Sequence, residues 1–174
     1  MIHGVNTQNI LLGGGRNTYI LVYCIAYDKK LDDYAESLAE KTGLKVVRLC
    51  SGLKQFCKNI FRHERKYLFP DVLNFISLFD NARYIITNSF HGTAFSLNLN
   101  KDFICFYGGP KGTRLENILN ITHTMHRHAE SYEDFDVINR PVNWDEVNSI
   151  LDTERRKASE WLKMVFADIQ QHKH

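Results

Sequence analysis

The sequence is poor in the residues that mark fibrous, disordered and membrane-spanning chains. It has 10 glycines and 3 prolines in 174 residues, which excludes collagen-like and low-complexity chains. Its longest uninterrupted apolar run, from Tyr19 to Tyr27, has nine residues, about half of what a membrane-spanning helix needs. No secretory signal pattern follows Met1. We therefore expect a cytoplasmic protein with no membrane span.

An excess of one charge and closely paired cysteines are also missing. Lys and Arg total 22 against 20 acidic residues, and this net charge of +2 is far from the basic excess of a nucleic-acid-binding protein. The cysteines form no CxxC pair, so the sequence signals neither a zinc knuckle nor a redox pair. They are Cys24, Cys50, Cys57 and Cys105. Two of them lie within apolar runs, where a thiol is usually a small buried hydrophobe.

What the sequence does contain is a regular alternation of strand and helix patterns. Residues 1–18, with three consecutive glycines, are expected to be a flexible lead-in to a single domain over 19–170 and a tail over 171–174. Apolar runs predict strands at 19–26, 44–49, 83–87 and 102–107. Helical periodicity predicts helices at 28–41, 53–66, 70–81, 91–99, 113–121 and beyond Pro141. This alternation predicts an α/β fold, a doubly wound Rossmann-like parallel sheet of about four to five strands.

Two of the predicted helices have a distinctive face. The helix over 53–66 has basic residues opposite its apolar stripe, which are either a phosphate-binding surface or the solvated face of an amphipathic helix. These residues are Lys54, Lys58, Arg62, Arg65 and Lys66. In the last helix, Trp144 and Trp161 recur at helical spacing with other apolar residues, and we expect both to anchor that helix to the sheet.

The most informative strand end is the turn after Thr87, because ligands of open α/β sheets bind at the carboxyl ends of strands. The first turn of the helix that follows presents unpaired N–H groups and a partial positive charge, which favour an anion. The side chains there that can donate hydrogen bonds are those of Asn88, Ser89, His91 and Thr93. Gly92 permits close approach of a ligand or of a neighbouring backbone. The simpler alternative is that Asn88 or Ser89 caps the helix and His91 is structural.

Two further clusters of polar residues follow. The glycine-rich turn over 107–114 carries Lys111 and Arg114, which suit a phosphate or carboxylate, although a solvated surface loop fits equally well. His123, His126 and His128 do not share one helical face, and no carboxylate at good spacing completes a ligand set. We expect no metal.

The segment over 81–96, NARYIITNSFHGTAFS, resembles the signature segment of the polysaccharide pyruvyl transferase family. Four further elements agree in order: the strand over 19–27 with the helix over 30–42, the helix after Pro70, the strand over 100–104, and Arg114 followed by leucines. The resemblance extends over roughly residues 18 to 170. It implies a two-domain, GT-B-like architecture with the active site between two Rossmann-like halves, of which this chain is the C-terminal one.

The resemblance also implies an activity, a transferase of exopolysaccharide biosynthesis that moves a pyruvyl group from phosphoenolpyruvate onto sugar hydroxyls as a ketal, without a cofactor. By position His91 is the expected catalytic residue. The expected substrate-binding residues are Asn88, Ser89, Gly92, Thr93, Lys111 and Arg114. Ser89 stands where some members carry an arginine, and Arg114 or Lys111 is the candidate source of the missing charge.

Because the implied site needs an N-terminal domain or a partner chain, we expect little or no turnover by this chain alone. Two alternatives stay open. One is a nucleotide-sugar glycosyltransferase half-domain of the same layout, in which the anion site takes a diphosphate. The other is a catalytically idle binding module of a polysaccharide-synthesis complex.

Overall fold

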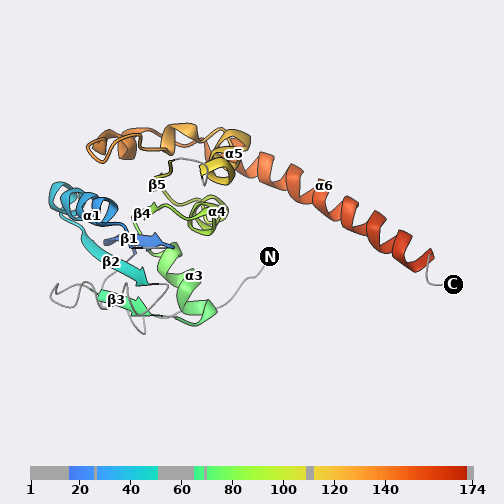
Figure 1. The fold of residues 1–174 in the computed structure, drawn as a ribbon, viewed down its shortest axis with the longest axis horizontal. Coiled ribbons are helices and arrows are strands. Elements are labelled where there is room, and N and C mark those ends of the chain that lie inside the picture. Colours follow the sequence, from blue (N-terminus) through green and yellow to red (C-terminus); the bar gives the residue numbers. More distant parts are fainter. Residues whose placement is uncertain (1–15, 26, 51–64, 69, 109–111, 172–174) are drawn as a thin grey trace.

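The computed structural model describes residues 16–171 except Ala26, 51–64, Phe69 and 109–111. These residues form an all-parallel, five-stranded sheet with helices on both faces (Figure 1). Its strands are β1 (Tyr19–Cys24), β2 (Lys45–Cys50), β3 (Arg65–Leu68), β4 (Tyr84–Thr87) and β5 (Phe103–Cys105), in the order β3-β2-β1-β4-β5. The helices are α1 (Lys29–Thr42), α3 (Val72–Asp80), α4 (Phe90–Asn98), α5 (Thr113–Ile121) and α6 (Trp144–Gln171), with short 3-10 turns η2 (Met125–Arg127) and η3 (Phe135–Asn139). The predicted doubly wound, Rossmann-like sheet is confirmed.

Helix α1 shows why the ends and the apolar face of a helix could be predicted from the sequence. Asp28 caps it, because its Oδ1 accepts hydrogen bonds from the backbone N–H of Lys30 and Leu31 at 3.0 and 3.2 Å. Gly43 ends it with a φ of 68°, in the left-handed region that favours glycine. Its apolar stripe includes Leu31 and Leu38, which are fully buried against the sheet.

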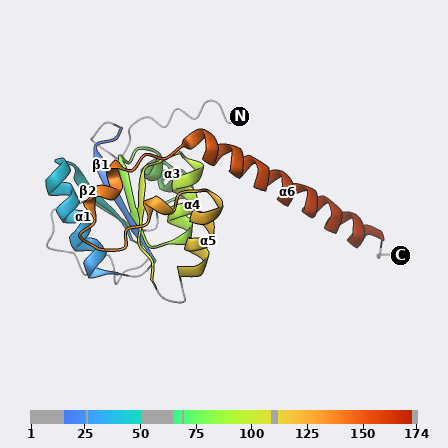
Figure 2. The ribbon, with the colours of Figure 1, turned by 90° about the horizontal axis from the view of Figure 1, so that it is seen from above.

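The core has two halves, one on each face of the sheet. In β1, Tyr19 and Leu21 pack on the α3, α4 and α5 side, whereas Ile20 and Val22 pack on the α1 side. This alternation follows from the period of two in a strand, and it makes β1 apolar on both faces, as in a central strand. Figure 2 shows the helices separated into these two layers.

The structure corrects two sequence predictions between β2 and α3. Arg65 and Lys66 begin strand β3, not the end of a basic helix, and the rest of that predicted helix lies outside the described residues. Among the described strands β3 pairs with β2 alone, and such an edge strand tolerates charged residues that a central strand would not. Pro70 lies outside α3, because Asp71 is the N-cap and accepts a hydrogen bond from the Asn74 N–H at 2.9 Å.

The two tryptophans of α6 have different surroundings. Trp144 and Leu151 are half-buried and pack with the buried Val147 on the core of the domain, which confirms the predicted anchor at Trp144. Trp161 is 62% exposed, so the prediction was wrong for it. The helix is longer than the domain is wide and projects beyond it (Figure 2). None of the described helices combines the length and apolar character required to cross a bilayer.

The segment between α5 and α6 is held by a buried arginine. Arg127 is fully buried and donates three hydrogen bonds to backbone carbonyls, to Phe103 from Nε at 2.7 Å and to Val137 and Arg140 from Nη1 at 2.8 Å. Burial lowers its pKa, but a guanidinium remains charged at any pH the protein meets. Arg127 therefore ties η3 to strand β5.

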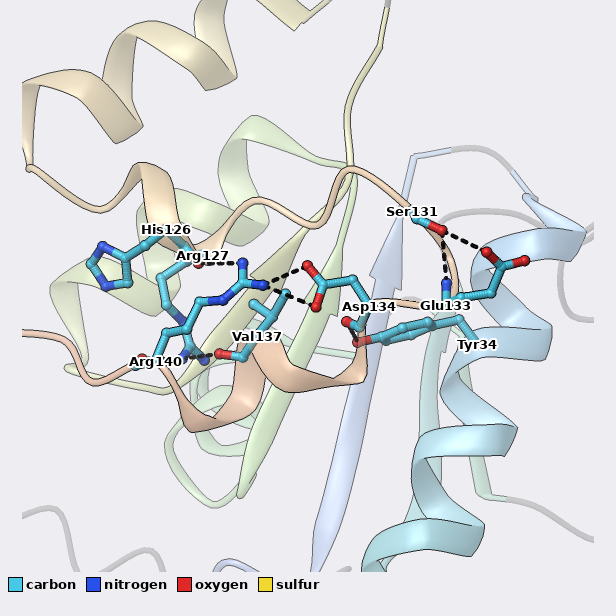
Figure 3. Close-up of polar contacts among 8 residues, drawn as sticks. All are labelled: Tyr34, His126, Arg127, Ser131, Glu133, Asp134, Val137 and Arg140. Carbon is cyan, nitrogen blue, oxygen red and sulfur yellow. Dashed lines mark hydrogen bonds and ion pairs between the residues drawn. The ribbon is translucent and has the colours of Figure 1, made fainter.

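Asp134 makes the second set of contacts in this segment (Figure 3). Arg140 Nη2 donates to both of its carboxylate oxygens, at 3.0 and 2.7 Å. Tyr34 of α1 donates from its hydroxyl to the Asp134 carbonyl at 3.0 Å. These contacts fix the loop before η3 against α1.

Candidate functional site

A cleft of about 800 Å³ lies over the carboxyl edge of the sheet. The chain runs from β1 outward to β2 and β3 on one side and from β4 to β5 on the other, so the strand order reverses between β1 and β4. Loops diverge at such a switch point and leave a crevice. The lining residues are Ile25 and Asp28 after β1, Asn88, Phe90 and His91 after β4, Phe106, Tyr107 and Gly108 after β5, Gly112, Thr113, Arg114 and Leu115 at the start of α5, and Ala129, Glu130 and Tyr132.

Thr87 shapes the turn that leads from β4 into α4. Its hydroxyl donates to the Tyr23 carbonyl of β1 at 2.6 Å and accepts from the Ser89 N–H at 3.0 Å. Ser89 is the N-cap residue, but its hydroxyl makes no capping hydrogen bond. The first-turn N–H groups of α4 therefore lack the side-chain acceptor that usually caps them. These groups and the partial positive charge of the helix start can bind an anionic ligand.

Two predicted residues and an aromatic ring form one side of the cleft, which we call the cationic wall (Phe90, His91 and Arg114). The His91 ring is exposed, and its centroid lies 6.0 Å from that of Phe90. The Arg114 guanidinium lies 5.9 Å from the same Phe90 ring. Asn88 lines the cleft nearby, and its buried Oδ1 has no hydrogen-bond partner among the described residues. The structure thus brings together Asn88, His91 and Arg114.

Three other predicted residues do not line the cleft. Ser89, Gly92 and Thr93 are buried, and the Thr93 hydroxyl lies 3.5 Å from the Cys105 sulfur. A Cβ on Gly92 would lie 2.2 Å from the Thr87 Oγ1, so its close neighbour is the protein itself. Substrate contact by these three residues stays a prediction, and Lys111 lies outside the described residues.

The opposite side of the cleft was not predicted. We call it the acidic wall (Asp28, Phe106, Glu130 and Tyr132). The Tyr132 hydroxyl donates to the Asp28 Oδ2 at 3.1 Å, and its ring stacks on Phe106 with centroids 4.7 Å apart. Burial and the neighbouring Asp28 carboxylate raise the pKa of Tyr132 to about 12, so the hydroxyl keeps its proton. Glu130 is exposed and makes no hydrogen bond or ion pair with another described residue.

Tyr107 is another lining residue without a sequence signal. Its ring stacks on His128 with centroids 3.9 Å apart, and its hydroxyl donates to the Met125 sulfur at 3.8 Å. A Cβ on Gly112 would lie 2.6 Å from the Tyr107 ring, so glycine is needed for this close approach. Tyr107 is thereby fixed between η2 and the start of α5.

The described cysteines do not suit a nucleophile. Cys24, Cys50 and Cys105 are all buried. Burial raises the pKa of each thiol, that of Cys105 to about 12. Because the thiolate is the reactive form, these side chains act as small apolar groups of the core.

The three clustered histidines have separate surroundings. His123 pairs with Glu146 at 2.6 Å, and His128 stacks on Tyr107. The Nε2 of His126 is buried without a hydrogen-bond partner in the described part of the chain. Among the described residues no three candidate metal ligands gather at one point.

The fold and the cleft define a Rossmann-type α/β domain with a crevice at its topological switch point. A family model described as polysaccharide pyruvyl transferase matches residues 12–110, which is more than half of the 174 residues. The chain belongs to the polysaccharide pyruvyl transferase family, as its signature segment predicted. The match includes Asn88 and His91 and ends before Arg114. No curated protein matches the chain at a significant level.

Proposed function

We propose that this domain binds phosphoenolpyruvate for transfer of its pyruvyl group onto two hydroxyls of a sugar. The observation that carries the proposal is the cationic wall beside the uncapped start of α4. In this reaction two C–O bonds form at the carbon that bore the phosphate, and free phosphate leaves. Of the two protons lost by the hydroxyls, one ends on the methylene carbon, which becomes a methyl group, and the other on phosphate. Membership of the family supports a transferase with a sugar acceptor.

Arg114 is the cation that we assign to the donor. Phosphoenolpyruvate carries a carboxylate and a phosphate, and a guanidinium can bind either through two parallel hydrogen bonds. The hydroxyl of Ser89, which stands where some members carry an arginine, is buried and uncharged. Arg114, in the first turn of α5, lines the same cleft as His91. A guanidinium there can replace the charge that Ser89 lacks.

His91 is suited to two tasks in this proposal. Its exposed ring lies in the first turn of α4, where helix N–H groups and the ring can contact the same anionic group. Contact with the donor phosphate or carboxylate is the task we assign first. Delivery of the proton to the methylene carbon is the second, because this step needs a positioned proton donor and a histidine ring can serve as one.

Titration of phosphoenolpyruvate into the chain, followed by amide NMR, tests the assignment. Arg114→Met and His91→Gln should each weaken binding by about tenfold or more, because each removes contacts to a charged group. The matched control is Arg83→Met. Arg83 pairs with Asp102 at 2.8 Å and directly precedes β4. It therefore lies at the amino ends of the strands, whereas the cleft lies at their carboxyl ends, and its loss should leave binding unchanged.

Two results would contradict the proposal. Unchanged donor affinity in both cleft variants would mean that the anion binds elsewhere. Absence of any donor binding to the wild-type chain would favour an idle binding module. We also propose that the chain alone binds without turnover, since the expected architecture needs a second half, and pyruvylation of a sugar by this chain alone would refute that.

A further inference from the structure

The donor contacts proposed above use only the cationic wall of the cleft. The acidic wall lines the same cleft but belongs to the other layer of the domain. Phe106 and Tyr132 pack in the core cluster on the α1 side of the sheet, whereas Phe90 packs in the cluster on the side of α3, α4 and α5. The two walls thus meet over the carboxyl ends of β1, β4 and β5. Their chemistry differs, because the acidic wall has two carboxylates, and the nearest cation with a known contact to it is Lys30, whose Nζ lies 6.0 Å from the Tyr132 ring centroid.

The cleft is larger than the donor requires. Its volume of about 800 Å³ falls within the range of pockets that hold drug-sized ligands, roughly 300–1,000 Å³. Phosphoenolpyruvate is a three-carbon molecule, so much of this space remains when it lies against the cationic wall. A second ligand, or a second part of one ligand, fits the remaining space.

The acidic wall favours a ligand that donates hydrogen bonds and carries no negative charge. An ionised carboxylate only accepts hydrogen bonds, so Glu130 and Asp28 would repel a second anion. Asp28 already accepts two backbone N–H groups at Oδ1 and the Tyr132 hydroxyl at Oδ2, which holds its orientation. Glu130 makes no hydrogen bond or ion pair with another described residue and is therefore the main acceptor left for a ligand.

The aromatic part of this wall adds a second requirement. Phe106 is buried and stacks on one face of the half-buried Tyr132 ring, and the Lys30 Nζ lies 6.0 Å from the ring centroid, so the ring offers the cleft its remaining exposed part with a hydroxyl at its edge. The hydroxyl proton is used for Asp28, but the oxygen can accept a hydrogen bond from a ligand. A sugar ring meets both requirements, since its hydroxyls donate and its C–H groups pack on an aromatic ring.

We infer that the acidic wall binds the hydroxyls of a sugar ring, with Glu130 and the Tyr132 oxygen as acceptors. The role of this sugar as the acceptor of the pyruvyl group rests on the proposed function, whereas its binding does not. Sugar hydroxyls of this kind occur in the pyranose of an acceptor and in the ribose of a nucleotide. The experiment separates these two sources.

The test uses the full chain and three separate probes in amide NMR titrations: phosphoenolpyruvate, methyl β-galactoside and uridine. Glu130→Gln should weaken the binding of a sugar probe about tenfold, because a neutral amide oxygen is a weaker hydrogen-bond acceptor than a carboxylate and the amide nitrogen does not accept. Tyr132→Phe should weaken it about threefold, the effect of one neutral hydrogen bond. The matched control is Glu133→Gln, since Glu133 is also exposed but contacts Ser131 and does not line the cleft.

The outcomes distinguish the inference from the proposed function. Saturable binding of either sugar probe that weakens in the Glu130 variant but not in the Glu133 variant supports the inference, and the probe that binds identifies the source. Binding of neither sugar probe, or equal binding by wild type and the Glu130 variant, overturns it. If phosphoenolpyruvate fails to bind while Glu130-dependent sugar binding persists, the proposed function fails and the inference stands.

Discussion

The two walls of the cleft are built in different ways. The cationic wall comes from short stretches at the starts of α4 and α5, and Thr87 sets its central turn through hydrogen bonds to a neighbouring strand and to Ser89. In the acidic wall, Asp28 and Tyr132 are hydrogen-bonded although 104 positions separate them. One wall therefore depends on a local turn, and the other on the tertiary contacts that hold the segment after α5. We therefore expect that each can be disturbed without the other.

The largest expected effect is on the acidic wall, through Arg127. Replacement of Arg127 by Met removes the donor of three hydrogen bonds, two of them buried, to the carbonyls of Phe103 and Val137, and one part-buried, to that of Arg140. We expect a loss of about 3 kcal/mol in the free energy of unfolding. Leaving buried carbonyls without a hydrogen-bond donor destabilises the fold by more than removing the buried charge stabilises it. Urea denaturation followed by circular dichroism measures it.

Arg140→Met is the control for Arg127. Its side chain is 39% exposed and pairs with Asp134, so its loss should cost about 1 kcal/mol or less. Amide NMR of the Arg127 variant should show shifts concentrated at residues 129–140, with those of α4 little changed. Equal destabilisation by the two substitutions would show that Arg127 is not the main support of this wall.

The next effect concerns the cationic wall, through Gly92. In Gly92→Ala the new methyl group would lie 2.2 Å from the Thr87 Oγ1, which is held by two hydrogen bonds, and 3.0 Å from the Tyr23 ring. Helix α4 must shift, and we expect a loss of about 2 kcal/mol despite the better helix propensity of alanine. Thermal unfolding measures this loss.

Gly108→Ala provides the matched control, since a Cβ there meets no atom within 4 Å. Its stability should stay close to that of the wild type. The Gly92 variant should also lose affinity for phosphoenolpyruvate, because His91 moves with α4, whereas sugar binding at the acidic wall should persist. A Gly92 variant as stable as the wild type would mean that α4 does not need this close contact.

The same contrast explains what the sequence could predict. Caps and periodicity act within a few residues, so α1 with Asp28 and Gly43 was predicted, as was α5 over its whole length. The turn with His91 was found because a polar stretch follows an apolar strand. Strand β3 was missed because an edge strand can carry basic residues and lacks an alternating pattern.

The acidic wall could not be predicted for a different reason. Asp28 gave a local signal as a helix cap, but nothing near it in the sequence points to Tyr132, because their contact depends on how the segment after α5 returns across the sheet. The sequence likewise gave no indication of the role of Arg127. Arginines are mostly surface residues, so burial of this one could not be expected, and here it is fully buried. The exposure of Trp161 was not predicted, because helical spacing shows that apolar residues share one face of a helix but not whether another part of the protein packs against that face.

The smallest expected effect again separates the walls, through the pH dependence of stability. Burial of the ring, together with the charges of Arg127 and Arg140, lowers the pKa of His126, although a hydrogen bond with the Pro141 backbone opposes this. The unfolded chain therefore binds a proton at this residue more readily than the folded chain. Stability is fully present above the unfolded pKa, about 6.5, and part of it is lost as the pH falls through that value toward the lower folded pKa.

The variant His126→Gln should flatten this dependence. Urea midpoints of the wild type and the variant, compared at pH 8 and pH 5, measure the difference, and the wild type should lose more on acidification. The loss should be accompanied by amide shifts in residues 125–140, because His126 lies in the segment that supports the acidic wall, with α4 unaffected. An identical pH dependence in both proteins would mean that the His126 ring is as free to accept a proton in the folded chain as in the unfolded one.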